Sequence, residues 1–138
     1  MSIFVLIAGT YTPFCLLALE GTWRWGLLSL IWVLALCGVL LKLLWMDAPR
    51  WLSVVLYLGM GWVALIAAPA LFRAVDVGGM AWVLAGGLTY SAGALVYALE
   101  RPNLVPGVFG FHEVWHLLVM AGSACHFWAV LRYVAPLA

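Results

Sequence analysis

The stretch FHEVWHLLVMAGSACHFWAVLRYV, residues 111–134, is almost entirely apolar, and only Glu113 and Arg132 in it carry a full charge near neutral pH. An α-helix needs about 20 predominantly apolar residues to cross the hydrocarbon core of a bilayer. Each of the two charges is the third residue from an end of the stretch, so neither has to lie at the centre of the membrane. The stretch therefore predicts a transmembrane helix.

Four further apolar stretches precede this one, and charged residues or prolines separate them. The five predicted segments are 3–19, 25–45, 51–72, 79–99 and 111–134. Each is long enough to span a bilayer as a helix, and the short connections make sequential helices antiparallel. We therefore expect an all-α fold, a multi-pass transmembrane bundle of five spans in which residues 1–138 form one domain.

The composition supports a membrane protein. The chain is 68% hydrophobic and 8% charged, whereas a soluble domain carries roughly 25% charged residues. A net charge of +1 provides no basic patch, which argues against nucleic acid as a partner and leaves membrane lipid as the expected one. The three cysteines are dispersed within apolar runs, and such an odd set predicts buried packing residues, with no disulfide framework.

Loop charges do not fix the orientation of the bundle. Three basic residues fall on the side where the first segment starts, and three fall on the other side. The two sets are Lys42, Arg50 and Arg101, and Arg24, Arg73 and Arg132. Because the rule that basic loops stay in the cytoplasm needs an imbalance, it makes no prediction here.

His112 and His116 are the main candidate functional residues. At i and i+4 they lie about 40° apart around a helix and one turn apart along it, so both can hold one metal ion such as zinc. Alternatively, they form an interfacial pair satisfied by backbone carbonyls or water. A third interpretation takes the string His112-Glu113-x-x-His116 as a metalloprotease motif with Glu113 as general base. That site needs a third protein ligand, and no second acidic motif lies within another segment.

The third histidine does not belong to the same site. His126 follows His116 by ten residues, which places it about 15 Å further along the helix. We expect it to pack against a neighbouring helix or to bond to a Thr or Ser. A catalytic zinc ion normally has three protein ligands and a water, so His112 and His116 would form an incomplete site.

Several motifs resemble the hemolysin III family, the bacterial branch of the progestin and adipoQ receptor superfamily. Residues 111–127, FHEVWHLLVMAGSACHF, resemble its last helix, and residues 3–14, IFVLIAGTYTPF, resemble its third. Residues 56–62, LYLGMGW, are similar to part of its fifth helix, and 86–90, GGLTY, to part of its sixth. The resemblance extends over essentially the whole chain.

The resemblance implies a seven-helix bundle with a cytoplasmic amino end and a zinc ion near the cytoplasmic face. Its two last-helix ligands match His112 and His116, and its third ligand is a His of the second helix. An Asp at the start of the third helix would immediately precede Ser2. Because the resemblance begins at the third helix, we expect a truncated piece of a longer protein, and the alternative is a genuine five-span variant.

Three functions remain in competition. The first is a hemolysin III-type protein of the bacterial inner membrane, with a zinc site and a hemolytic, membrane-perturbing role. The second, by resemblance to adiponectin receptors, is a zinc-dependent amide hydrolase acting on a ceramide-like lipid, with Glu113 orienting a ligand or relaying a proton. The third is a structural or receptor module whose histidines do no chemistry. The sequence leaves open whether the protein is an enzyme.

Overall fold

The computed structural model describes residues 2–138, and helices dominate them. The helices are α1 (Ser2–Pro13), α2 (Gly21–Leu44), α3 (Arg50–Trp62), α4 (Ala68–Ala74), α5 (Val77–Leu99) and α6 (Phe111–Ala129). A π-helical turn, Phe14–Ala18, continues α1, and a π-helical turn, Val130–Val134, followed by a 3₁₀ turn, Ala135–Leu137, continues α6. Within residues 2–138 the only β pairing is an isolated bridge between Val105 and Phe109. The predicted all-α fold is confirmed.

Each of the five predicted segments contains a helix, but the helices differ in length. Three are long and apolar enough to cross a membrane on their own: Gly21–Leu44, Val77–Leu99 and Phe111–Leu137. A fourth crossing is formed if Arg50–Leu65 and Ala68–Ala74, which meet at 54°, act as one broken span. Ile3–Ala18 is apolar but shorter. The described residues thus form a multi-pass membrane bundle, and the number of five spans stays a prediction.

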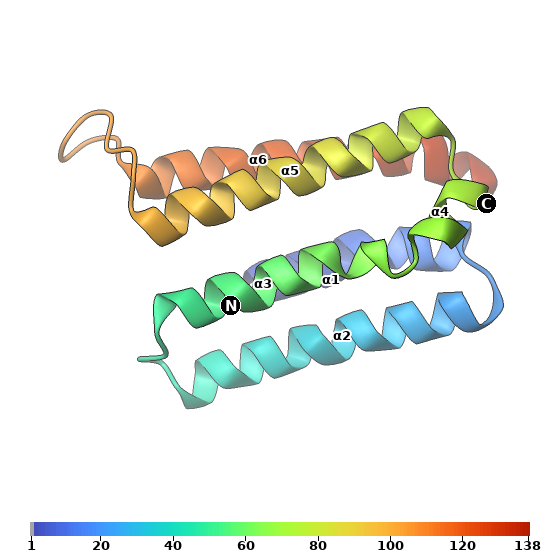
Figure 1. Ribbon diagram of the computed structural model, residues 1–138, viewed down its shortest axis with the longest axis horizontal. Coiled ribbons are helices and arrows are strands. Elements are labelled where there is room, and N and C mark those ends of the chain that lie inside the picture. The colour runs from blue at the N-terminus through green and yellow to red at the C-terminus, as the bar shows by residue number, and fades with distance from the viewer. Residues whose placement is uncertain (1) are drawn as a thin grey trace.

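The long helices run side by side along one axis (Figure 1). α5 and α6 form one layer, α1 and α3 lie next to it, and α2 covers the opposite side of α1. The connection between α5 and α6 projects from the same end of the bundle as the connection between α2 and α3 (Figure 1). α6 starts at this end, which we call the histidine end because it carries His112 and His116.

The interior contains two groups of buried apolar side chains. One surrounds Phe4, Ile31 and Met60, and the other surrounds Phe14, Leu71 and Val134. Large apolar side chains on the outer faces of the helices, among them Trp25 and Leu88, are exposed. An exposed apolar surface of this extent fits a protein surrounded by lipid.

The third predicted segment is not one straight helix. α3 ends at Trp62, a 3₁₀ turn covers Val63–Leu65, and α4 starts at Ala68. Pro69 lies in the first turn of α4, where its missing N–H is not needed for a helical hydrogen bond. The helix therefore breaks before the proline, at residues 66–67.

The cysteines are free, as predicted, but they are not all buried. Cys15 is buried and Cys125 is partly buried, whereas Cys37 is exposed on α2. The prediction of burial is wrong for Cys37 because the outer face of a lipid-facing helix is as apolar as its inner face. An apolar run therefore does not show which side of the helix packs inward.

Candidate metal centre

Glu113 fixes the start of the helix that carries the histidine pair. Its Oε2 atom accepts a hydrogen bond of 2.8 Å from the backbone N–H of Gly110, the residue that precedes α6. The backbone N–H groups at a helix start have no partner within the helix. A side-chain acceptor at the third helical position can bond to the N–H of the residue that precedes the helix. The carboxylate of Glu113 is thus engaged in capping α6.

His112 and His116 turn their rings toward one another. Their Nε2 atoms are 3.1 Å apart, and the ring centroids are 4.6 Å apart with planes at 84°. Both residues are exposed at the surface of the described chain. The i, i+4 spacing therefore brings the two ring nitrogens to one point.

The separation of the two Nε2 atoms fits a shared zinc ion. With Zn–N bonds of about 2.0–2.1 Å, two tetrahedral imidazole ligands have their nitrogens about 3.3 Å apart. The observed 3.1 Å is close to that value. The same distance also suits an N–H···N hydrogen bond between two neutral imidazoles. Both interpretations of the pair from the sequence are therefore compatible with its geometry.

Among residues 2–138, the histidine pair has no third metal-ligating side chain beside it. Within residues 2–138 no group of three or more His, Cys, Asp or Glu side chains could hold a metal ion. Trp115, which lies between the two histidines in sequence, has a buried Nε1 atom without a hydrogen-bond partner in this part of the chain. A metal held by His112 and His116 would take its other ligands from water or from groups outside the described residues.

An apolar groove of about 900 Å³ leads from His116 along the bundle. It lies between α1 and α6, and His116 and Trp115 line it. Ser123, Thr10 and His126 contribute further polar groups, and most of the other lining side chains are aliphatic. The groove therefore places one candidate metal ligand, His116, beside a mainly apolar surface.

His126 packs inside the bundle, as predicted. Its ring stacks on Tyr90 of α5 with centroids 5.3 Å apart and planes at 16°. Its Nδ1 atom is 2.9 Å from the carbonyl oxygen of Gly122 and donates to it, since a carbonyl only accepts. Of the two predicted alternatives, packing against a neighbouring helix is therefore the one observed, and the ring bonds to a backbone carbonyl of its own helix.

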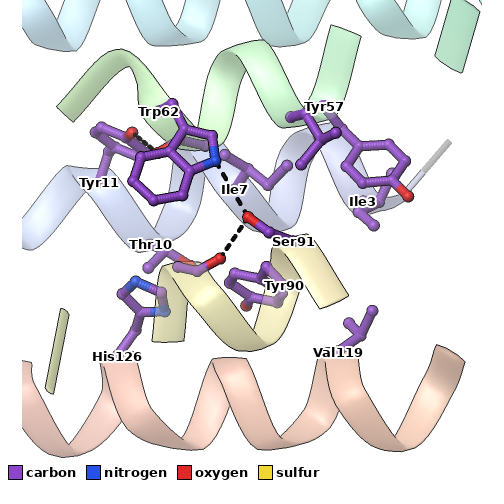
Figure 2. Close-up of a pocket in the computed structure, with 13 residues that line it drawn as sticks. Ile3, Ile7, Thr10, Tyr11, Tyr57, Trp62, Tyr90, Ser91, Val119 and His126 are labelled. Carbon is purple, nitrogen blue, oxygen red and sulfur yellow. Dashed lines mark hydrogen bonds between the residues drawn. The ribbon is translucent and has the colours of Figure 1, made fainter. Parts of the chain in front are cut away.

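Around His126 lies a group of polar side chains that the sequence did not single out. Figure 2 shows them lining a small cavity of about 50 Å³ between α1, α3, α5 and α6. Trp62 donates to the hydroxyl of Ser91 at 3.1 Å, and the hydroxyls of Tyr90 and Ser123 are 2.7 Å apart. The sequence signal for this group was the presence of hydroxyl-bearing residues within otherwise apolar segments.

The fold and the histidine pair define a class of helical membrane proteins with a candidate metal site at one end of the bundle. A family model described as Haemolysin-III related matches residues 1–127. The chain therefore belongs to the hemolysin III family, as the motifs of its first and last helices predicted.

Curated relatives agree with this assignment. The chain is 41% identical over 137 residues to Hemolysin-3 of Bacillus cereus, covering 99% of this chain and 60% of the relative. It is 39% identical over 132 residues to the Hemolysin-3 homolog of Bacillus subtilis, covering 96% and 59%. The human monocyte to macrophage differentiation factor is 25% identical over 134 residues, covering 97% and 53%. The chain thus spans little more than half the length of these relatives. No solved structure matches it.

Proposed function

We propose that this hemolysin III-type membrane protein binds zinc and that His112 and His116 are two of the ligands. We further propose that the histidine end faces the cytoplasm in a bacterial inner membrane, and that the protein perturbs membranes. The observation that supports the zinc site is the 3.1 Å separation of the two Nε2 atoms. A neutral imidazole is a common zinc ligand, and an i, i+4 pair presents two of them on one helix face.

Measuring metal content tests the zinc site directly. The chain is purified in detergent, loaded with zinc, desalted and assayed for zinc per polypeptide. We expect His112→Ala and His116→Ala each to lower zinc retention strongly, because one imidazole remains. His126→Asn is the matched control, since His126 packs against Tyr90 away from the pair. Equal retention by all variants, or none by the wild type, would contradict the site and favour a hydrogen-bonded histidine pair.

The names of the Bacillus relatives support the membrane-perturbing role. The described helices present no polar stripe that could line a pore, and the cavities between them are mainly apolar. We therefore propose disturbance of lipid packing and not a channel formed by one copy. Dye release from liposomes containing the purified chain tests this role. Vesicles that stay intact at high protein loading would contradict it.

The groove beside His116 supports a second candidate, a zinc-dependent amide hydrolase acting on a lipid. Bound zinc supplies a Lewis acid for a carbonyl group and acidifies water. The aliphatic lining of the groove would hold an acyl chain with its polar group near His116. Release of fatty acid from ceramide by wild type and its loss in His112→Ala would support this function. Release that survives both histidine substitutions would exclude a role for the pair.

A further inference from the structure

Trp115 lies in contact with both candidate metal ligands. Its ring centroid is 5.3 Å from that of His112 and 4.6 Å from that of His116, with the planes tilted by 51° and 46°. The indole is partly buried and the imidazoles are exposed. Trp115 thus forms a wall on the bundle side of the pair and limits the rotation of both rings.

Trp115 is itself held in place from α5. Tyr97 packs on its indole with ring centroids 4.8 Å apart. The two helices are close here, since a Cβ at position 93, one turn earlier on α5, would lie 3.3 Å from Cβ of Leu118 and in ordinary contact, at 3.5 Å, with Cδ1 of Trp115. The close approach of α5 to α6 therefore sets the position of the indole.

A charged group also lies over the ring of Tyr97. The Cζ atom of Arg50, the first residue of α3, lies 5.3 Å from the centroid of the Tyr97 ring. Arg50 also pairs with Glu100 at the end of α5. Three helices thus contribute to a continuous stack, from Arg50 through Tyr97 and Trp115 to the two histidines.

We propose that Trp115, supported by Tyr97, is a positioning residue that holds the rings of His112 and His116 in the converging arrangement that binds a metal ion. This inference rests on the proposed zinc site. Two free imidazoles on a helix surface each sample several rotamers, and ordering them costs free energy when a metal binds. A rigid aromatic wall removes most of that cost in advance.

The experiment measures metal affinity in the purified full chain. Zinc affinity is obtained by competition with a chelating dye, and Co²⁺ replaces zinc as a probe whose visible absorption reports coordination geometry. Loss of groups that orient metal ligands costs about 10–100-fold in affinity, and we expect Trp115→Leu to lose zinc affinity within that range and to change the Co²⁺ spectrum. Trp115→Phe keeps an aromatic ring and should recover part of the affinity.

Two controls separate positioning from general stability. Trp128 lies in the same predicted segment, pairs with Trp82 of α5 and is far along the helix from both ligands. Trp128→Leu should therefore leave zinc affinity and the Co²⁺ spectrum unchanged. Tyr97→Phe should bind zinc like the wild type, and Tyr97→Leu should bind more weakly. If the wild type binds zinc and Trp115→Leu binds it with equal affinity, the positioning role alone is overturned. Absence of zinc binding in the wild type would overturn the zinc site and this inference together.

Discussion

The hydroxyl of Tyr11 on α1 donates a hydrogen bond to the carbonyl oxygen of Gly61 on α3, at 2.7 Å. The carbonyl oxygen of Met60 is also within reach at 2.9 Å, and the same hydroxyl accepts from the backbone N–H of Ala64 at 2.9 Å. These backbone groups lie where α3 gives way to the 3₁₀ turn Val63–Leu65. Because lipid offers no hydrogen bonds, a broken helix in a membrane needs partners of this kind. Tyr11 supplies them from a neighbouring helix.

Tyr11→Phe should therefore destabilise the bundle. The substitution keeps the ring and leaves the backbone groups at the break without their partner, which costs about 1–3 kcal/mol. The free energy of unfolding is measured by SDS titration of the protein in mixed micelles. Tyr133→Phe is the control, because no hydrogen bond of the Tyr133 hydroxyl is found within residues 2–138. Equal effects of the two substitutions would show that the break does not depend on Tyr11.

Two adjacent glycines of α5 provide a second prediction. A Cβ at position 86 would overlap the ring of His126, whereas a Cβ at position 87 would meet no atom within 4 Å. Gly86→Ala forces the helices apart or displaces the ring, and overpacking of this kind costs about 1–3 kcal/mol. Gly87→Ala should cause no loss. The same SDS titration compares the two variants, and equal stabilities would mean that the His126 ring moves aside freely.

The sequence predicted the helices well because a continuous apolar run and its length determine whether a segment can span lipid. It placed the start of the second helix at residue 25, whereas α2 starts at Gly21. Trp23 and Arg24 are residue types that are common at the level of the lipid headgroups, but a helix can continue through the headgroup region. Pro69 in the sequence predicted a kink in this segment, and the helix breaks just before that proline. The partner of the freed carbonyls was not predicted, because the hydroxyl of Tyr11 comes from about fifty residues away in sequence.

The site was predictable where local geometry decides it. The i, i+4 spacing alone predicts that His112 and His116 meet, and their Nε2 atoms do so. The roles of Trp115 and Tyr97 were not predictable, because they depend on how closely α5 approaches α6. The capping role of Glu113 is predictable from its place in the first turn of the helix, whereas the string His112-Glu113-x-x-His116 favoured an interpretation as a general base.

Glu113 should matter more for the stability of α6 than its exposure suggests. Glu113→Ala removes the acceptor of the Gly110 N–H and should lower the melting temperature, because an N–H at the helix start loses its capping partner. Glu113→Gln keeps a side-chain oxygen and should retain most of the stability. Thermal unfolding followed by circular dichroism measures both variants. Glu20→Ala is the control, since Glu20 precedes α2 without a side-chain cap bond. A loss as large in Glu20→Ala would mean that capping is not the cause.

The ion pair between Arg50 and Glu100 should contribute little by itself. The two side chains are 43% and 56% exposed, and exposed pairs contribute about 0–1 kcal/mol and weaken as salt is added. Arg50 additionally lies over the ring of Tyr97, a contact that contributes about 0.5–1 kcal/mol at an exposed site. Arg50→Gln should therefore cost more stability than Glu100→Gln, and only the coupling between the two positions should fall at high salt. A double-mutant cycle at low and high NaCl measures both quantities. If Glu100→Gln were the costlier change, the carboxylate and not the aromatic contact would be the main partner of Arg50.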